Sequence, residues 1–138
     1  MRFETYASFA NAFVAEYAAE IGVGDDLRLA TRTLRALVEG LRAGLSRRAS
    51  ARLLRELPLM IKALYVDGWD LEGQTAGDEA GLTSFVDAPL PGLPVELRGR
   101  DALAALFKVL QRHAGAAELQ ELRLALPTQI GGLVARAA

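Results

Sequence analysis

The chain has 138 residues, half of them hydrophobic, and a net charge of −1, which suits one domain or two tightly joined halves. It contains no cysteine, so disulfides, thiol nucleophiles and thiolate metal sites are excluded, as suits a reducing cytoplasm. The N-terminus carries acids within its apolar pattern, unlike a secretory signal, and no run of about 18 uncharged apolar residues could span a membrane. We therefore expect a cytoplasmic protein that makes no membrane contact.

Alanine and leucine dominate the hydrophobic residues and β-branched residues are few, which predicts an all-α fold. The first helix is expected over 3–20, where aromatic side chains recur at four-residue spacing, and the second over 25–43 after a glycine-rich break. Ser46 then caps a third helix over about 47–56. Pro58 separates that helix from a further apolar helical pattern.

The second half of the chain begins with a change of composition. Residues 67–97 are rich in glycine, proline and acids, and we predict a connector there, interrupted by a short helix over 81–88. Helical patterns resume over 98–113 and 116–125, and Pro127 begins the last helix. The sequence therefore predicts two helical segments on either side of a connector.

The two helical segments match each other at a shift of 69 residues, without a gap over 33–65. The matched positions are almost all predicted core positions, and the rare dipeptide at Leu57 and Pro58 returns at Leu126 and Pro127. We therefore predict a helical bundle built from two tandem copies of a three- to four-helix unit that pack as one compact domain. The predicted parts are a first repeat over 1–66, a connector over 67–97 and a second repeat over 98–138.

Four segments of the chain resemble a known bacterial family. They are the aromatic start SFANAFVAEYAAEIGV, then LATRTLRALVEGLRAGLS, then LLRELPLMIKALYVDGWD, and later DALAALFKVLQRHAGAAELQELRLALPTQIGGLV. Together they are similar to the domain of unknown function 2267 over most of the chain, with the connector least alike. The resemblance implies an all-α fold in small bacterial proteins and no agreed activity, so it assigns no residue a role. The second copy departs from the family in its shortened first helix and in having no counterpart of 67–69.

No catalytic or metal-binding constellation is recognisable in the sequence. His113 is the only histidine, and the helix dipole explains its place near a predicted helix C-terminus. We interpret Asp67, Asp70 and Glu72 as a solvated acidic loop rather than a site for a hard cation. The G-x-G within 21–26 follows a helix instead of a strand, which excludes a dinucleotide fingerprint. We therefore expect no enzyme activity, no catalytic residue, no metal and no cofactor.

Charge is distributed unevenly along the chain. Residues 28–62 carry nine bases and two acids, whereas residues 67–101 carry eight acids and two bases. On helical wheels the arginines form two stripes, of which the first comprises Arg28, Arg32, Arg35 and Arg42 and the second Arg48, Arg52 and Arg55. None of the positions 69 residues further on is basic, so the fold itself does not require these charges. Two interpretations stay open: a face that is solvated or paired internally, through Glu39 and the acidic connector, or a surface for an anionic partner.

Two aromatic residues after Pro58 complete the candidate sites. Tyr65 and Trp69 are predicted to lie at the junction between the copies or at an interface, where tryptophan is enriched. The preferred hypothesis is a non-catalytic interaction or assembly module of a bacterial cytoplasm, which acts through a protein partner or self-association. The alternative is a module that binds nucleic acid or another anion through the arginine stripes. A less favoured alternative is a small-molecule binder with a pocket between the repeats.

Overall fold

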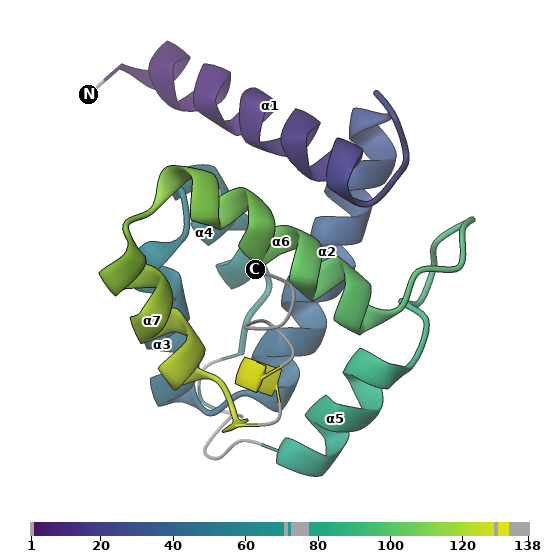
Figure 1. Cartoon of the computed structure of the whole chain (residues 1–138), viewed down its shortest axis with the longest axis vertical. Coiled ribbons are helices and arrows are strands. Elements are labelled where there is room, and N and C mark those ends of the chain that lie inside the picture. Colours follow the sequence, from purple (N-terminus) through teal and green to yellow (C-terminus); the bar gives the residue numbers. More distant parts are fainter. Residues whose placement is uncertain (1, 71, 73–77, 129, 133–138) are drawn as a thin grey trace.

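The computed structural model describes residues 2–70, 72, 78–128 and 130–132, and it is all-α, as the sequence predicts (Figure 1). Its helices are α1 (Phe3–Glu20), α2 (Leu27–Gly44), α3 (Arg47–Glu56), α4 (Leu59–Val66), α5 (Glu79–Asp87), α6 (Gly99–His113) and α7 (Ala116–Ala125). Residues 128 and 130–132 are also helical, directly after Pro127. None of the described helices combines the length and the apolar character needed to cross a lipid bilayer.

Side-chain caps fix where three of the helices begin. The carboxylate of Asp26 accepts a hydrogen bond from the backbone N–H of Leu29 at 3.0 Å, so α2 starts after this residue, later than the sequence predicts. Ser46 Oγ accepts one from the N–H of Ala49 at 3.1 Å and begins α3 where the sequence predicts it. Asp78 caps α5 in the same way, so α5 starts two residues earlier than predicted. Each such cap contributes about 1 kcal/mol to helix stability.

The corner between α3 and α4 consists of Leu57 and Pro58. α3 ends at Glu56, and the proline directly precedes α4, where its missing N–H costs no hydrogen bond. The carbonyl oxygen of Pro58 accepts a hydrogen bond from the N–H of Lys62 at 2.8 Å, which closes the first turn of α4. Leu57 and Ile61 are buried on the two sides of the corner. The proline therefore separates the two helices, as the sequence predicts.

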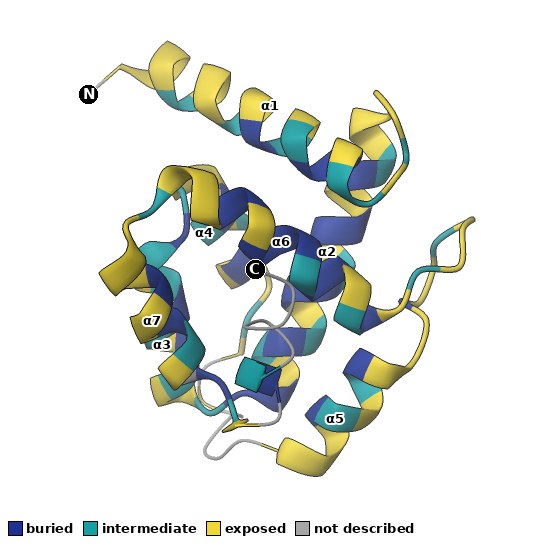
Figure 2. Ribbon diagram, viewed as in Figure 1, coloured by how far each residue is buried: buried dark blue, intermediate teal, exposed yellow. Residues whose placement is uncertain are grey.

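The core lies around α2 and α6, and α1 packs across both of them (Figure 1). Figure 2 shows buried segments concentrated on these two helices, which contribute Leu34 and Leu106 among other fully buried side chains. One buried polar contact joins α1 to α6, because the hydroxyl of Tyr17 donates a hydrogen bond to the carbonyl oxygen of Ala102 at 2.9 Å. Burial raises the pKa of Tyr17. The hydroxyl therefore stays protonated and anchors the C-terminal half of α1.

The helix contacts are reciprocal between the two halves of the chain. α1 packs on α2 and α6, α5 packs on the same two helices, and α3 packs on α7. α3 occupies 47–56 and α7 occupies 116–125, so they have equal length and match the register found in the sequence. The duplication and the division into three parts stay predictions.

Two glycines let α5 approach α2 closely. A Cβ atom added at Gly44 would lie 2.8 Å from Cβ of Leu82, and the ring of Phe85 occupies the space beside Gly40. Real Cβ atoms do not come this close to another side chain, so no larger residue fits at Gly44 unless α5 moves. The small residues, four positions apart, therefore determine how α5 packs.

Candidate functional site

The arginine stripe of α2 lies against residues 67–70, which directly follow α4 and are called the tail of α4 below. Arg35 forms an ion pair with Asp67 at 3.0 Å. Arg42 donates hydrogen bonds to the carbonyl oxygens of Tyr65 at 2.9 Å and Asp67 at 2.6 Å. Of the two internal partners that the sequence offers, Glu39 and the acidic connector, it is Asp67 at the start of the connector that pairs with Arg35. An arginine from a neighbouring helix thus satisfies carbonyl groups at the end of α4 that have no partner within that helix.

Most arginines of the α2 stripe bind groups of the same chain. Arg32 donates a hydrogen bond to the carbonyl oxygen of Gly92 in the connector region at 2.6 Å. Arg28 is exposed, and the described residues give it no partner. Gly68 has a φ of +74°, which lets the tail turn back toward α2. The structure thus favours internal pairing for three of the four arginines of α2.

The arginine stripe of α3 divides between two surfaces. Arg52 forms an ion pair with Glu121 of α7 at 3.1 Å, where the two halves of the chain meet. Arg48 and Arg55 are exposed, and among the described residues neither has a hydrogen-bond or ion-pair partner. Because residues seven apart share one face of a helix, these two arginines lie on the same side of α3.

An apolar groove of about 410 Å³ lies beside Arg55, between α3 and α4. We call it the α3–α4 groove, and its lining residues are Ala51, Leu54, Arg55, Leu59, Met60, Lys62, Ala63 and Val66. Three of its apolar side chains are exposed to solvent by 45% (Leu59), 48% (Met60) and 46% (Val66). The sequence does not indicate this groove, because α4 is apolar on nearly every side and its pattern does not tell which side stays uncovered.

A second groove, of about 370 Å³, occupies the corresponding position in the other half of the chain. Its lining residues are Gln120, Arg123, Leu124, Leu126, Thr128, Gly131 and Gly132. Six of them lie 69 positions after residues that line the α3–α4 groove. At these positions Leu54 becomes Arg123, Leu59 becomes Thr128, and the basic Lys62 becomes a glycine. A groove thus occurs at the same place in both halves of the chain. The combination of an apolar lining with basic residues at the edge is a feature of the first groove.

Tyr65 and Trp69, the predicted junction residues, lie where α4 meets α3 and the tail. Tyr65 is fully buried, and its hydroxyl lies 2.7 Å from Oγ of Ser50 in α3. Burial, partly offset by the Ser50 hydrogen bond, raises the pKa of Tyr65 to about 12. The half-buried ring of Trp69 contacts the Tyr65 ring edge-on, with 5.7 Å between their centroids. Tyr65 therefore fixes one wall of the α3–α4 groove against the other.

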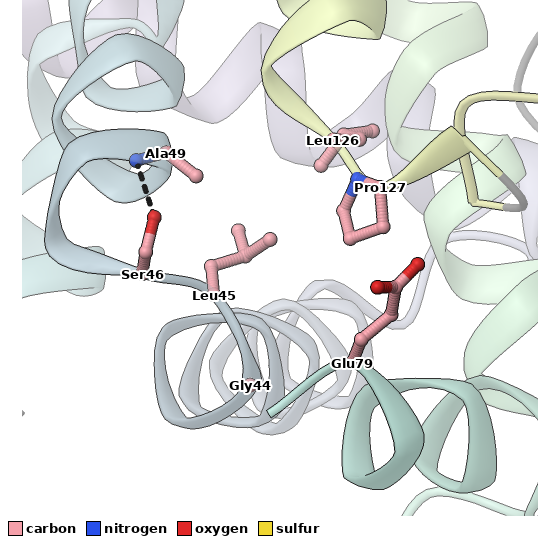
Figure 3. A pocket seen from close by; sticks show the side chains of 7 residues that line it. All are labelled: Gly44, Leu45, Ser46, Ala49, Glu79, Leu126 and Pro127. Atoms are coloured by element: carbon pink, nitrogen blue, oxygen red, sulfur yellow. Dashed lines mark hydrogen bonds between the residues drawn. The ribbon is translucent and has the colours of Figure 1, made fainter. Parts of the chain in front are cut away.

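A smaller pocket lies between the two halves of the chain, where the hypothesis of a small-molecule binder expects one. It encloses about 290 Å³, and its lining residues are Gly44, Leu45, Ser46, Ala49, Glu79, Leu126 and Pro127. Figure 3 shows Leu45 facing Leu126 and Pro127 across the hollow, with Glu79 at its edge. The hydroxyl of Ser46 already caps α3, and Glu79 is the one ionisable side chain among the described residues of the lining. Among the described lining residues, no histidine or lysine accompanies Ser46, and its hydroxyl serves the helix instead.

His113 joins the end of α6 to α1. Its Nε2 lies 2.6 Å from a carboxylate oxygen of Glu16, and its ring contacts the ring of Phe9 edge-on at 5.2 Å between centroids. The neighbouring Arg112 forms ion pairs with Glu16 and Glu20. Within the described residues, no three histidine, aspartate or glutamate side chains gather where they could hold a metal ion. The histidine is thus part of a contact between helices.

The N-terminal half of α1 extends past the body of the molecule, as Figures 1 and 2 show. Phe13 is fully buried, Phe9 of the same aromatic stripe is 41% exposed, and Phe3 on another side of the helix is 79% exposed. The stripe thus continues beyond the part that α2 and α6 cover. Exposed aromatic side chains of this size are typical of surfaces that contact another molecule.

Together these features define an all-α protein whose most distinctive surface is an apolar groove with basic residues at its edge. A family model described as uncharacterized conserved protein (DUF2267) matches residues 10–133. The chain therefore belongs to this family, which confirms the resemblance seen in the sequence. A search of curated proteins finds no match.

Proposed function

We propose that the protein is a non-catalytic interaction module that binds another protein through the α3–α4 groove. One observation carries the proposal: Leu59, Met60 and Val66 form a solvent-exposed apolar surface that the body of the molecule leaves uncovered. Solvent-exposed apolar patches lower solubility, so a protein that keeps one generally uses it for contact. The cysteine-free sequence suits the reducing bacterial cytoplasm in which we expect the protein to act.

The counterpart groove supports the view that this apolar lining is not needed for folding. There, positions equivalent to Leu54 and Leu59 are occupied by Arg123 and Thr128, although the adjoining helices end and begin in the same register. A fold that accepts a threonine at the position equivalent to the exposed Leu59 does not require an apolar residue there. The apolar residues of the first half are thus available for a partner.

The test is a pair of variants in which one apolar surface residue becomes an acid. Met60→Glu introduces a charge in the α3–α4 groove, and the matched control Leu124→Glu does so on α7, where the leucine is 61% exposed. Both should fold, because neither site is buried. Quantitative affinity capture from the host should recover a partner with the wild type and Leu124→Glu and lose it with Met60→Glu. Equal capture by all three proteins would refute the proposal.

Self-association through α1 is a second candidate contact, favoured by the exposure of Phe3. Sedimentation velocity at micromolar to millimolar concentration measures it. Phe3→Asp should reduce any association seen with the wild type, because it replaces an apolar anchor by a charge. Association that is unchanged by this substitution would exclude the exposed half of α1 as the contact.

Binding of nucleic acid through the arginine stripes has less support. Most arginines of α2 already bind groups of the chain, and Arg52 pairs with Glu121. Arg28, Arg48 and Arg55 remain available for a phosphate, according to the described residues. Mixed DNA and RNA at about 50 mM salt, where phosphate contacts are strongest, tests this alternative, and it fails if neither is retained.

A further inference from the structure

The edge of the α3–α4 groove carries a set of basic side chains without acidic counterparts. Arg55 and Lys62 line the groove directly. Arg47 and Arg48 extend the same side of α3 toward its N-terminus, since Arg47 lies one turn before Ala51 and Arg48 two turns before Arg55. In the described residues none of these four bases has an ion-pair partner. The groove is therefore apolar in its floor and positively charged along its edge.

We infer that the occupant of this groove is an amphipathic helix of another protein, whose apolar stripe is flanked by glutamate or aspartate side chains. The inference rests on the proposed function and specifies the chemistry of the partner. Its apolar stripe would bury Leu59, Met60 and Val66, and its carboxylates would lie beside Arg55 and Lys62. Charge complementarity of this kind selects partners and accelerates their association.

The shape of the groove fits a helix. Leu59, Ala63 and Val66 recur at spacings of four and three along α4, so they form the kind of ridge that packs into the groove between two ridges of a second helix. α4 has eight residues and therefore extends over about 12 Å, which matches two turns of a bound helix. Met60 adds a flexible side chain that adapts to different partners.

The exposed aromatic half of α1 in a second copy does not supply these carboxylates. Its acid, Glu4, lies two positions from the base Arg2, so this segment carries no surplus negative charge. The other acids of α1, Glu16 and Glu20, are already bound to Arg112. The charge of the groove therefore does not favour the exposed half of α1 from a second copy as its occupant.

The experiment measures binding of labelled peptides to the full-length protein by fluorescence polarisation. The first peptide, of about 18 residues so that it can form a helix alone, has a leucine stripe flanked by glutamates. The second has the same stripe flanked by lysines, and the third keeps the glutamates but replaces the leucines by serines. We expect the first peptide to bind at least about tenfold more tightly than the other two, with an affinity that falls as salt rises.

Variants then assign the binding to the groove. The double variant Arg55→Glu, Lys62→Glu should prefer the lysine-flanked peptide, which reverses the selectivity of the wild type. Met60→Glu should weaken binding of the glutamate-flanked peptide at least about tenfold, because it places a charge in the apolar floor. The control Leu124→Glu should leave both affinities unchanged. Circular dichroism of each variant verifies that it folds.

Three results would overturn the inference. Equal binding of the glutamate-flanked and lysine-flanked peptides would remove the role of charge. Equal binding of the serine-containing peptide, or of mixed DNA, would mean that the bases form a surface for any polyanion. Dimers of the wild type that Met60→Glu dissociates would make a second copy the occupant. If the peptides fail to bind while capture of a host protein still depends on Met60, the inference fails and the proposed function stands.

Discussion

The hydroxyl pair between Ser50 and Tyr65 links the two helices that form the α3–α4 groove, so its removal is a direct test of how the groove is held. The two oxygens lie 2.7 Å apart, and both side chains are fully buried. Ser50→Ala leaves the tyrosine hydroxyl buried without its partner, which costs about 1–3 kcal/mol of unfolding free energy. Tyr65→Phe leaves the serine hydroxyl, which can turn to the carbonyl oxygen of Ser46 one turn earlier, so we expect a smaller cost of about 0.5–1.5 kcal/mol.

The double variant completes a double-mutant cycle, in which we expect the losses of unfolding free energy not to add. Because it removes both polar groups, we expect Ser50→Ala, Tyr65→Phe to cost no more than Ser50→Ala alone. Urea unfolding at neutral pH, followed by circular dichroism and by the fluorescence of Trp69 beside the pair, measures the three free energies. Costs that simply add, or a Tyr65→Phe variant less stable than Ser50→Ala, would refute the hydrogen bond as the link between the helices.

Three further predictions concern the rest of the fold. Gly44→Ala should lower the unfolding free energy by about 1–3 kcal/mol, although alanine favours helices, because its Cβ would lie 2.8 Å from Leu82; thermal unfolding measures this. Burial raises the pKa of Tyr65 to about 12 and raises that of Tyr17, so the folded state retains protons that the unfolded chain loses from about pH 10. The contribution of these two tyrosines to stability should therefore be constant below about pH 10 and fall above it, so that stability decreases less steeply in Tyr65→Phe, as urea unfolding above about pH 8 will measure. Pro58→Ala should let α3 and α4 merge or straighten, with a gain in helical circular dichroism and a loss of stability; no change in either would mean that the corner is set elsewhere.

The helices were predictable where the sequence contains its own start and stop signals. Ser46 and Pro58 delimit α3 through local chemistry, a side-chain cap and a missing N–H, which do not depend on distant residues. The sequence predicts the start of α2 too early because both Asp25 and Asp26 are plausible caps, and only geometry tells which carboxylate reaches the N–H of Leu29. Local signals thus determine where helices exist more firmly than where they begin.

The site was harder to predict, because it depends on contacts between distant residues. Arg35 finds Asp67 rather than Glu39, which lies four residues away on the same helix, since the tail after α4 turns back at Gly68. The groove required knowing which side of a largely apolar helix stays uncovered, and Met60 gives no sign of this in the sequence. One signal for the groove was present in the sequence. When the two halves are compared at a shift of 69 residues, apolar groove-lining residues of the first half correspond to polar residues in the second.

The most direct test of the account follows the methyl group of Met60 by nuclear magnetic resonance. The sequence has two methionines, Met1 and Met60, so protein labelled with carbon-13 at the methionine methyl groups contains its own reference. Addition of the glutamate-flanked peptide should shift or broaden the Met60 signal and leave the Met1 signal in place, with saturation at the affinity found by polarisation. A Met60 signal that stays unchanged while the peptide is bound would contradict the α3–α4 groove as the interaction site.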